Sequence, residues 1–187
     1  MLDHSVGSGQ HSYEDRGADL YETPPAAVHA LLKVEKLPDY IWEPACGPGS
    51  IATVLRDAGH RVFASDLHDY GFSKYRIDFM DTKLTPSVGC VITNPPYKLA
   101  QQFVEKALEK APLVIMLLRL AFLESERRRK ILEHSGLARI HVFRNRLPMM
   151  HRHGWTGKKA SSAIPFAWFC WERGYVGPTT IDRISWE

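Results

Sequence analysis

YIWEPACGPGSIA, residues 40–52, is the stretch that decides the fold. Its apolar start predicts a buried strand, and Gly47-Pro48-Gly49 predicts a tight glycine loop directly after that strand. The apolar residues that follow recur at helical spacing as far as Gly59, a residue type that commonly ends a helix. A strand, a glycine loop and a helix in this order are typical of the nucleotide-binding unit of Rossmann-like α/β folds.

The rest of the chain alternates predicted strands with predicted helices. We predict further strands at 61–65, 75–79, 91–93, 112–118, 137–143 and 163–171, and helices that begin at 24 and 51 and span 98–110 and 125–134. Thr23 is the predicted N-cap of the first helix, and Pro24 its first residue. The order predicts an α/β protein with a mostly parallel sheet, helices on both faces and a final hairpin.

The composition is that of an ordinary globular protein: 44% of the 187 residues are hydrophobic and 24% are charged. The apolar run 113–118 ends at Arg119, so no run is long enough to span a membrane. Three scattered cysteines, an odd number, favour a reducing cytoplasm over a disulfide framework. We expect residues 1–17 to form a flexible tail and residues 18–187 to form one domain.

A second motif, Asn94-Pro95-Pro96-Tyr97, follows the strand at 91–93. Neither proline donates a ladder hydrogen bond, so the strand ends there and a stiff loop begins. The side-chain oxygen of Asn94 and the carbonyl of Pro95 are two acceptors that together can take both hydrogens of an exocyclic amine. Tyr97 offers a ring that can stack on the flat base carrying this amine. The motif therefore predicts an amino group of a nucleobase as the substrate.

This motif resembles motif IV of the amino-methyltransferases, the class I S-adenosylmethionine enzymes that methylate N6 of adenine or N4 of cytosine. The resemblance extends to motif X at residues 21–24 and to motif I at residues 43–49, where Glu43 stands in place of the more usual Phe or Asp. It implies a Rossmann-like sheet of seven strands, mostly parallel with the last strand antiparallel, and S-adenosylmethionine as cofactor. It also implies a DNA adenine-N6 methyltransferase of phage or prophage type, in the cytoplasm of a bacterial or phage-infected cell.

The resemblance implies a role for each matched residue. Thr23 and its neighbouring backbone would bind the methionine carboxylate, and Asp66 the ribose hydroxyls. Asp78, with Asp81 as the alternative, and Phe79 would bind the adenine ring. The expected cofactor-binding residues are Tyr21, Thr23, Pro24, Glu43, Pro44, Ala45, Cys46, Gly47, Gly49, Asp66, Asp78, Phe79 and Asn94. The expected catalytic residues are Asn94, Pro95, Pro96 and Tyr97.

Two residues of the glycine loop region favour a cationic ligand over a pyrophosphate. Pro48 removes one backbone N–H from a loop that would otherwise cradle phosphates. S-adenosylmethionine carries a sulfonium and an ammonium group instead, and both favour an acidic residue nearby. Glu43, at the tip of the first strand, is predicted to supply that negative charge.

Basic residues gather in one part of the chain. Residues 119–159 hold eleven Lys or Arg and three Asp or Glu, a local net charge of +8 in a chain whose total is +3. This imbalance favours a polyanion partner. The loop 144–162 is long for a hairpin and is predicted as a minimal target-recognition element. Its expected nucleic-acid-binding residues are Arg144, Arg146, Arg152, Trp155, Lys158 and Lys159. His151 and His153 have no Cys or acid nearby in the sequence, so no metal site is expected.

Together these features predict methyl transfer from S-adenosylmethionine to the N6 amine of adenine in DNA, at a short or relaxed recognition sequence. Two other acceptors stay open: the N2 amine of guanine in RNA and a glutamine amide of a protein. A non-catalytic subunit that only binds nucleic acid is a third alternative. The expected partners are DNA, with RNA as the alternative, and either a second copy of the chain or a separate specificity subunit.

Overall fold

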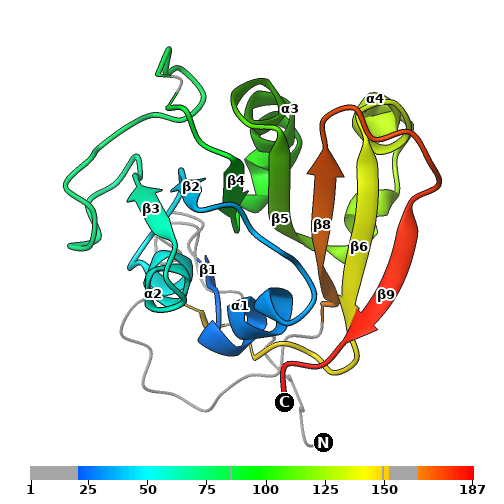
Figure 1. The fold of residues 1–187 in the computed structure, drawn as a ribbon, viewed down its shortest axis with the longest axis horizontal. Helices are drawn as coiled ribbons and strands as arrows, with labels where there is room; N and C mark the ends of the chain where they lie inside the picture. Colours follow the sequence, from blue (N-terminus) through cyan, green and yellow to red (C-terminus); the bar gives the residue numbers. More distant parts are fainter. Residues whose placement is uncertain (1–20, 85, 149, 152–163) are drawn as a thin grey trace, which may run out of the picture.

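The computed structural model describes residues 21–84, 86–148, 150–151 and 164–187. Its main feature is a seven-stranded sheet. From edge to edge, the strands are β3 (Arg61–Ala64), β2 (Tyr40–Glu43), β4 (Cys90–Thr93), β5 (Leu113–Arg119), β8 (Phe166–Glu172), β6 (Leu137–Phe143) and β9 (Thr180–Ile184). Figure 1 shows this order from β3 at the left to β9 at the right.

Only one strand of this sheet runs against the others. β3, β2, β4 and β5 pair in parallel, and β6 pairs in parallel with β9. β8 lies between β5 and β6 and is antiparallel to both. The prediction of a mostly parallel Rossmann-like sheet is confirmed, and the segment predicted as the last strand is the antiparallel one.

Four helices cover the two faces of the sheet: α1 (Pro25–Leu32), α2 (Ser50–Asp57), α3 (Ala100–Lys110) and α4 (Arg129–Glu133). Side chains alternate between the faces along each strand. Ile115 and Leu117 of β5 pack with α1 and α2, whereas Val114 and Met116 pack with α3 and α4. Figure 1 shows α1 and α2 on one side and α3 and α4 on the other. No helix in the described ranges is long and apolar enough to cross a membrane.

Short turns of 3-10 helix join several elements: η2 (Tyr97–Leu99), η3 (Leu120–Leu123) and η4 (Glu126–Arg128). The predicted helix at 98–110 is confirmed as η2 followed by α3. The predicted helix at 125–134 is instead η4 followed by the short α4. Ser125 has a φ of 103° and is not helical, so the helical segment begins at Glu126.

The start of α1 differs by one residue from the prediction. Thr23 makes no capping hydrogen bond, Pro24 is the N-cap residue, and the helix begins at Pro25. The end of α2 agrees with the prediction at Gly59. This glycine has a φ of 95°, and the next residue, His60, donates its N–H to Leu55 O at 3.0 Å, as in a Schellman motif.

Two strand predictions were incomplete. Residues 75–79 form no strand, and this segment makes only an isolated parallel bridge between Asp66 and Arg76. Apolar alternation was present, but the chain leaves the sheet edge after that single bridge. β9, in contrast, was not predicted, because four of its five residues are exposed and only Ile184 is buried. The sheet therefore has seven strands, as predicted, but β9 takes the place of the strand that was predicted at 75–79.

A second, two-stranded sheet joins the predicted motif X to the start of the basic loop. β1 (Tyr21–Glu22) pairs antiparallel with β7 (Met150–His151), so that Tyr21 is opposite His151 and Glu22 is opposite Met150. Segments about 130 residues apart in sequence are thereby held side by side. Residues 1–17, predicted as a tail, lie outside the described residues.

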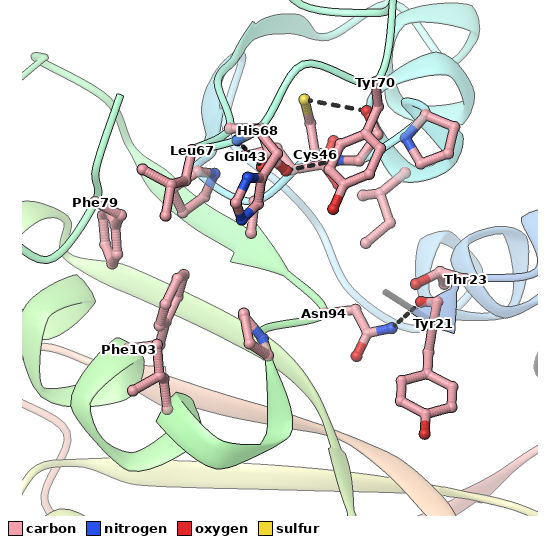
Figure 2. A pocket seen from close by; sticks show the side chains of 18 of the residues that line it. Tyr21, Thr23, Glu43, Cys46, Leu67, His68, Tyr70, Phe79, Asn94 and Phe103 are labelled. Carbon is pink, nitrogen blue, oxygen red and sulfur yellow. Dashed lines mark hydrogen bonds between the residues drawn. The ribbon is translucent and has the colours of Figure 1, made fainter. Parts of the chain in front are cut away.

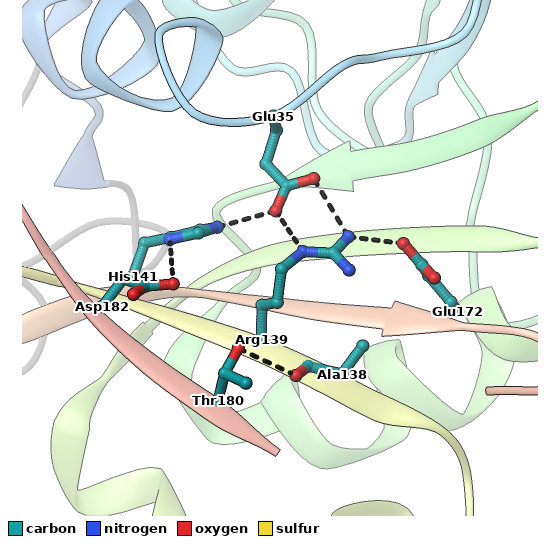
Figure 3. A network of polar contacts seen from close by, with 7 residues as sticks. All are labelled: Glu35, Ala138, Arg139, His141, Glu172, Thr180 and Asp182. Atoms are coloured by element: carbon teal, nitrogen blue, oxygen red, sulfur yellow. Dashed lines mark hydrogen bonds and ion pairs between the residues drawn. The ribbon is translucent and has the colours of Figure 1, made fainter. Parts of the chain in front are cut away.

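A polar network fixes the segment after α1 to the far half of the sheet. The Glu35 carboxylate accepts hydrogen bonds from Arg139 at 2.5 and 3.0 Å and contacts His141 Nε2 at 2.7 Å. Arg139 also pairs with Glu172 of β8 at 2.5 Å, and His141 Nδ1 lies 3.9 Å from Asp182 of β9. Figure 3 shows this network crossing three neighbouring strands, β8, β6 and β9.

Candidate active site

A cavity of about 260 Å³ lies beyond the carboxyl ends of β2, β3 and β4. β2 has β3 on one side and β4 on the other, so the connections leaving these strands diverge. Ligands of open α/β sheets bind at such a switch point. Figure 2 shows side chains from distant parts of the sequence around this space, with Asn94 and Tyr21 on one wall and Cys46 and Glu43 on another.

Most predicted cofactor-binding residues line this cavity. They are Tyr21, Thr23, Glu43, Pro44, Ala45, Cys46, Gly47, Asp66, Asp78, Phe79 and Asn94, and Pro96 of the predicted catalytic residues joins them. Pro24, Gly49, Pro95 and Tyr97 do not line it. The structure thus brings together three motifs that were identified separately along the chain.

Part of the wall was not predicted. The unpredicted lining residues are Glu22, Pro48, Ser50, Ile51, Leu67, His68, Tyr70, Ile77, Met80, Leu99 and Phe103. Leu99 and Phe103 were recognised only as the apolar face of a helix, because their spacing of four residues shows a shared face and not what that face meets. Glu22 lies within motif X, and its Oε1 accepts a hydrogen bond from Ser50 at 2.5 Å.

The glycine loop is shaped by residues without a Cβ. Gly47 has a φ of 51° and Gly49 a φ of 92°, both in the left-handed region. A Cβ on Gly49 would lie 2.3 Å from the ring of Phe72, so this position excludes any side chain. Gly49 donates its N–H to Cys46 O at 2.8 Å, which closes the turn immediately before α2. Gly49 therefore shapes the loop from behind the cavity, although it does not line it.

Asp66 fastens the glycine loop to the end of β3. Its Oδ2 accepts the N–H of Gly47 at 2.8 Å, and its Oδ1 accepts the N–H of His68 at 2.9 Å. Each carboxylate oxygen has a second lone pair, so both remain able to accept from a ligand hydroxyl. The residue is 8% exposed and lines the cavity, and its predicted place beside a ribose stays a prediction.

Glu43 is a buried acid with an unsatisfied oxygen. The residue is 1% exposed, and its Oε2 has no hydrogen-bond partner among the described residues. Burial raises the pKa of Glu43 well above its ordinary value, and the negative charge of Asp66 raises it further. A cationic group in the cavity would lower this pKa again, because it would stabilise the ionised carboxylate.

Asn94 is held by one end of its amide group. Its Nδ2 donates to Tyr21 O at 2.8 Å, a bond that Figure 2 shows. Its Oδ1 is buried and has no hydrogen-bond partner within the described ranges. The protein therefore uses the donor of this amide for positioning and leaves the acceptor unused, which is the group that the predicted chemistry requires.

The adenine end of the predicted site is apolar. Phe79 and Phe103 are buried and their ring centroids are 5.0 Å apart, and Figure 2 shows both side chains at one end of the cavity. Leu67 lines the same cavity and is 51% exposed. Asp78 is exposed and accepts the N–H of Met80 at 2.8 Å. These side chains suit a flat ring with one polar edge.

Tyr97 lies behind the wall formed by Asn94 and Pro96. Its ring stacks on Tyr21 with a centroid distance of 4.7 Å and lies 5.8 Å from the ring of Phe166. The guanidinium carbon of Arg119 lies 4.1 Å from the centroid of the Tyr97 ring. The ring therefore supports its neighbours, and its expected stacking on a base stays a prediction.

The predicted nucleic-acid-binding residues are only partly described. Arg144 and Arg146 are exposed and follow β6 directly. Arg152, Trp155, Lys158 and Lys159 lie outside the described residues. One described part of the basic loop lies near the site, because β7 pairs with β1, whose Tyr21 and Glu22 line the cavity.

One group of side chains in the described part of the chain has the composition of a metal site. Ligand atoms of Glu35, His141 and Cys170 lie within 4.8 Å of one another. The Glu35 carboxylate is already bonded twice by the guanidinium of Arg139, whose positive charge would repel a metal ion. We therefore interpret this group as part of the ion-pair network.

No protein-family model and no curated protein sequence matches the chain. Solved structures do match. A protein assigned as an RNA methyltransferase from Pyrococcus horikoshii is similar with a TM-score of 0.64 and 17% identity, over 85% of this chain and 88% of the other. These values show a shared fold.

Two further structures are similar over only part of their own length. One is a modification subunit assigned to a type I restriction enzyme from Vibrio vulnificus, with a TM-score of 0.59, 15% identity and coverage of 86% of this chain and 45% of that subunit. The other is TrmN from Thermus thermophilus, with a TM-score of 0.56, 18% identity and coverage of 80% and 48%. The chain thus spans about half of each, and the similarity again shows the Rossmann-like fold alone.

Proposed function

We propose that this protein transfers a methyl group from S-adenosylmethionine to the exocyclic N6 amine of adenine in DNA. The observation that carries the proposal is a pair of unsatisfied oxygens in one cavity. Among the residues that the structure describes, neither Glu43 Oε2 nor Asn94 Oδ1 has a hydrogen-bond partner, and both residues line the cavity. A cation would satisfy the first oxygen, and a hydrogen-bond donor would satisfy the second. A cofactor with an ammonium group and a substrate with an amine supply these two partners.

The residues fit the cofactor. S-adenosylmethionine, when bound, supplies a methyl group made electrophilic by its sulfonium sulfur. Glu43 would hold the ammonium group, Asp66 the ribose hydroxyls, and the apolar end at Phe79 and Phe103 the adenine ring. A buried carboxylate beside a cation is stabilised by a charge-assisted hydrogen bond, which is about twice as strong as a neutral one.

The Asn94 corner would prepare the amine for attack. Asn94 Oδ1 and the carbonyl of Pro95 would accept its two hydrogens, which draws the nitrogen lone pair out of conjugation with the base. These acceptors bind the tetrahedral nitrogen of the transition state better than the planar ground state, so they accelerate the reaction. The remaining acceleration comes from holding the amine in position to attack the methyl group. To reach the Asn94 corner, the target base must leave the helical stack.

Three features support a nucleic-acid substrate. Arg144 and Arg146 are exposed, and β7, within the basic loop, pairs with β1, whose Tyr21 and Glu22 line the cavity. Proteins of similar fold include one assigned as an RNA methyltransferase and a modification subunit assigned to a type I restriction enzyme. We place DNA first because motif X precedes motif I in the sequence. RNA comes second because of the similarity to the structure assigned as an RNA methyltransferase.

The test is a methyl-transfer assay on DNA and on RNA, followed by mass spectrometry of the nucleosides. N6-methyladenine from DNA supports the proposal. N2-methylguanine or N6-methyladenine from RNA would move the activity to the second substrate, and methylation of neither would favour a non-catalytic binding subunit. A glutamine-amide product on added protein would replace the nucleic-acid proposal altogether.

A substitution of Asn94 tests the proposed mechanism most directly. Asn94→Ala is expected to lower methyl transfer by at least about a hundredfold, since one preorganised hydrogen-bond partner is worth that much at a transition state. Its affinity for S-adenosylmethionine, measured by calorimetry, should stay within about tenfold because the other cavity contacts remain. Asn94→Asp keeps an acceptor and should keep part of the activity, and Gln102→Ala, an exposed amide on α3, is the matched control. Near-normal transfer by Asn94→Ala would refute the mechanism.

A further inference from the structure

Arg119 is a basic residue at the carboxyl end of β5, the strand next to β4 and its Asn94 corner. Its guanidinium carbon lies 4.1 Å from the centroid of the Tyr97 ring, close enough for a cation–π interaction. In the sheet Arg119 is opposite Phe166, the first residue of β8 after the basic loop. Arg119 therefore lies between Tyr97 of the Asn94 corner and the start of β8.

Other arginines that lie over aromatic rings have oxygen partners. Arg61 lies over Tyr40 and pairs with Asp39 at 2.7 Å. Arg128 lies over Phe122 and donates to three backbone carbonyls. Arg56 lies over Phe72 and donates to a backbone carbonyl at 2.9 Å.

Arg119 differs from these three. Its side chain makes no hydrogen bond and no ion pair with any described residue. Its Nε is buried without a partner there, as is the Nε of Arg128, but Arg128 donates through its Nη1. The N–H donors of a guanidinium lie in the plane of the group and point outward. Such a group is prepared for a ligand with oxygens in that plane, and carboxylates and phosphates have this geometry.

We propose that Arg119 binds a phosphodiester group of the nucleic acid beside the target nucleotide. The proposal rests on the proposed function and adds a residue to its substrate side. Neither Arg119 nor Tyr97 lines the cavity assigned to the cofactor, so the donors of Arg119 that lack a described partner lie outside that cavity. A phosphate held there would fix the backbone of the strand while the base reaches Asn94.

The test compares Arg119→Gln, which keeps a planar group without charge, with Arg119→Lys, which keeps the charge. The probes are a labelled adenine-containing DNA duplex and an RNA of the same sequence, titrated at several salt concentrations. Loss of one phosphate contact should lower the slope of log Kd against log salt by about one and weaken binding several-fold. Arg119→Lys should keep the slope. Arg61→Gln is the matched control, an arginine on a tyrosine ring with its own carboxylate partner.

The two proposals fail in different ways. In the methyl-transfer assay, Arg119→Gln should raise KM for the nucleic acid and leave kcat within a few-fold. An unchanged salt slope in Arg119→Gln would overturn the phosphate contact while leaving the enzyme proposal intact. Weaker binding of S-adenosylmethionine with an unchanged slope would also overturn it, because Arg119 would then hold the cofactor carboxylate. If Arg119→Gln has the smaller salt slope but the wild-type protein transfers no methyl group, only the enzyme proposal is refuted.

Discussion

In the cofactor-free protein, ionisation of the buried Glu43 side chain costs free energy. Its carboxyl group is 1% exposed, and burial raises its pKa well above the value of 4.5 that it has in an unfolded chain. As the pH rises above 4.5, the unfolded chain releases a proton that the folded protein retains. Stability of the free protein therefore falls as the pH rises toward the folded-state pKa.

Glu43→Gln should separate stability from binding. The neutral amide has no proton to lose, so the melting temperature of the free variant is expected to exceed that of the wild type by a few degrees at neutral pH. The difference should shrink toward pH 4.5. Affinity for S-adenosylmethionine should fall by about tenfold or more, because a charge-assisted hydrogen bond of about 1.5–3 kcal/mol is lost. Scanning calorimetry over pH and isothermal titration give both results.

Glu109→Gln, an exposed acid on α3, is the control and should change neither property. If Glu43→Gln melts at the wild-type temperature at every pH and binds the cofactor normally, the assignment of Glu43 to the ammonium group is wrong.

At the scale of elements, the glycine loop and α2 depend on one close approach. Gly49→Ala would place a Cβ 2.3 Å from the Phe72 ring and a non-glycine residue at a φ of 92°. Gly59→Ala is the matched control, since it has a φ of 95° with no atom within 4 Å of the added Cβ. The control should lose about 1–2 kcal/mol from backbone strain alone.

Gly49→Ala should lose clearly more than Gly59→Ala in urea unfolding, and it should bind S-adenosylmethionine more weakly because the loop is displaced. The double variant with Phe72→Ala should recover the excess, since the two side chains no longer meet. Equal losses for both glycine variants would mean that Phe72 moves aside without cost.

The elements around the site were predictable because their signals are local. A glycine loop after an apolar strand, and Asn94 before two prolines, fixed two strand ends from sequence alone. The failure at 75–79 has a tertiary cause, because pairing beyond the Asp66–Arg76 bridge depends on how the loop closes and not on alternation. β9 was missed because its own sequence pattern is weak. It is an edge strand whose exposed residues carry almost no apolar pattern.

The charge count of residues 119–159 also did not show which basic residues already have partners within the protein. Arg129 of α4 pairs with Glu126 and Glu133, and Arg128 donates to backbone carbonyls of η3 and the residue after it. These charges serve local structure. The sequence could not distinguish them from Arg119, because pairing depends on distances between side chains and not on their order.

At the scale of the whole molecule, the Glu35 network joins the α1 side to the far half of the sheet. Burial raises the pKa of Glu35, but hydrogen bonds with His141 and Arg139 outweigh it and hold the pKa at about 2. The lowered pKa adds stability that is fully present above pH 4.5 and is lost as the pH falls toward 2.

Glu35→Gln is therefore expected to lower the free energy of unfolding at pH 7 by about 3 kcal/mol, since it leaves Arg139 and His141 without their shared carboxylate. The deficit should disappear on acidification through this window, as the wild type loses the same contribution. Glu133→Gln, whose ion pair with Arg129 is exposed, should change stability little. An equal deficit at pH 7 and pH 2 would mean that packing, and not charge, sets the effect.

The ladder between β1 and β7 ties a wall of the cavity to the segment that leads into the basic loop. If binding of one ligand changes the affinity for the other through that ladder, thermodynamic reciprocity requires the second ligand to change the affinity for the first by the same factor. On the proposed function, the concentration of S-adenosylmethionine would then regulate how much of the protein stays bound to the nucleic acid.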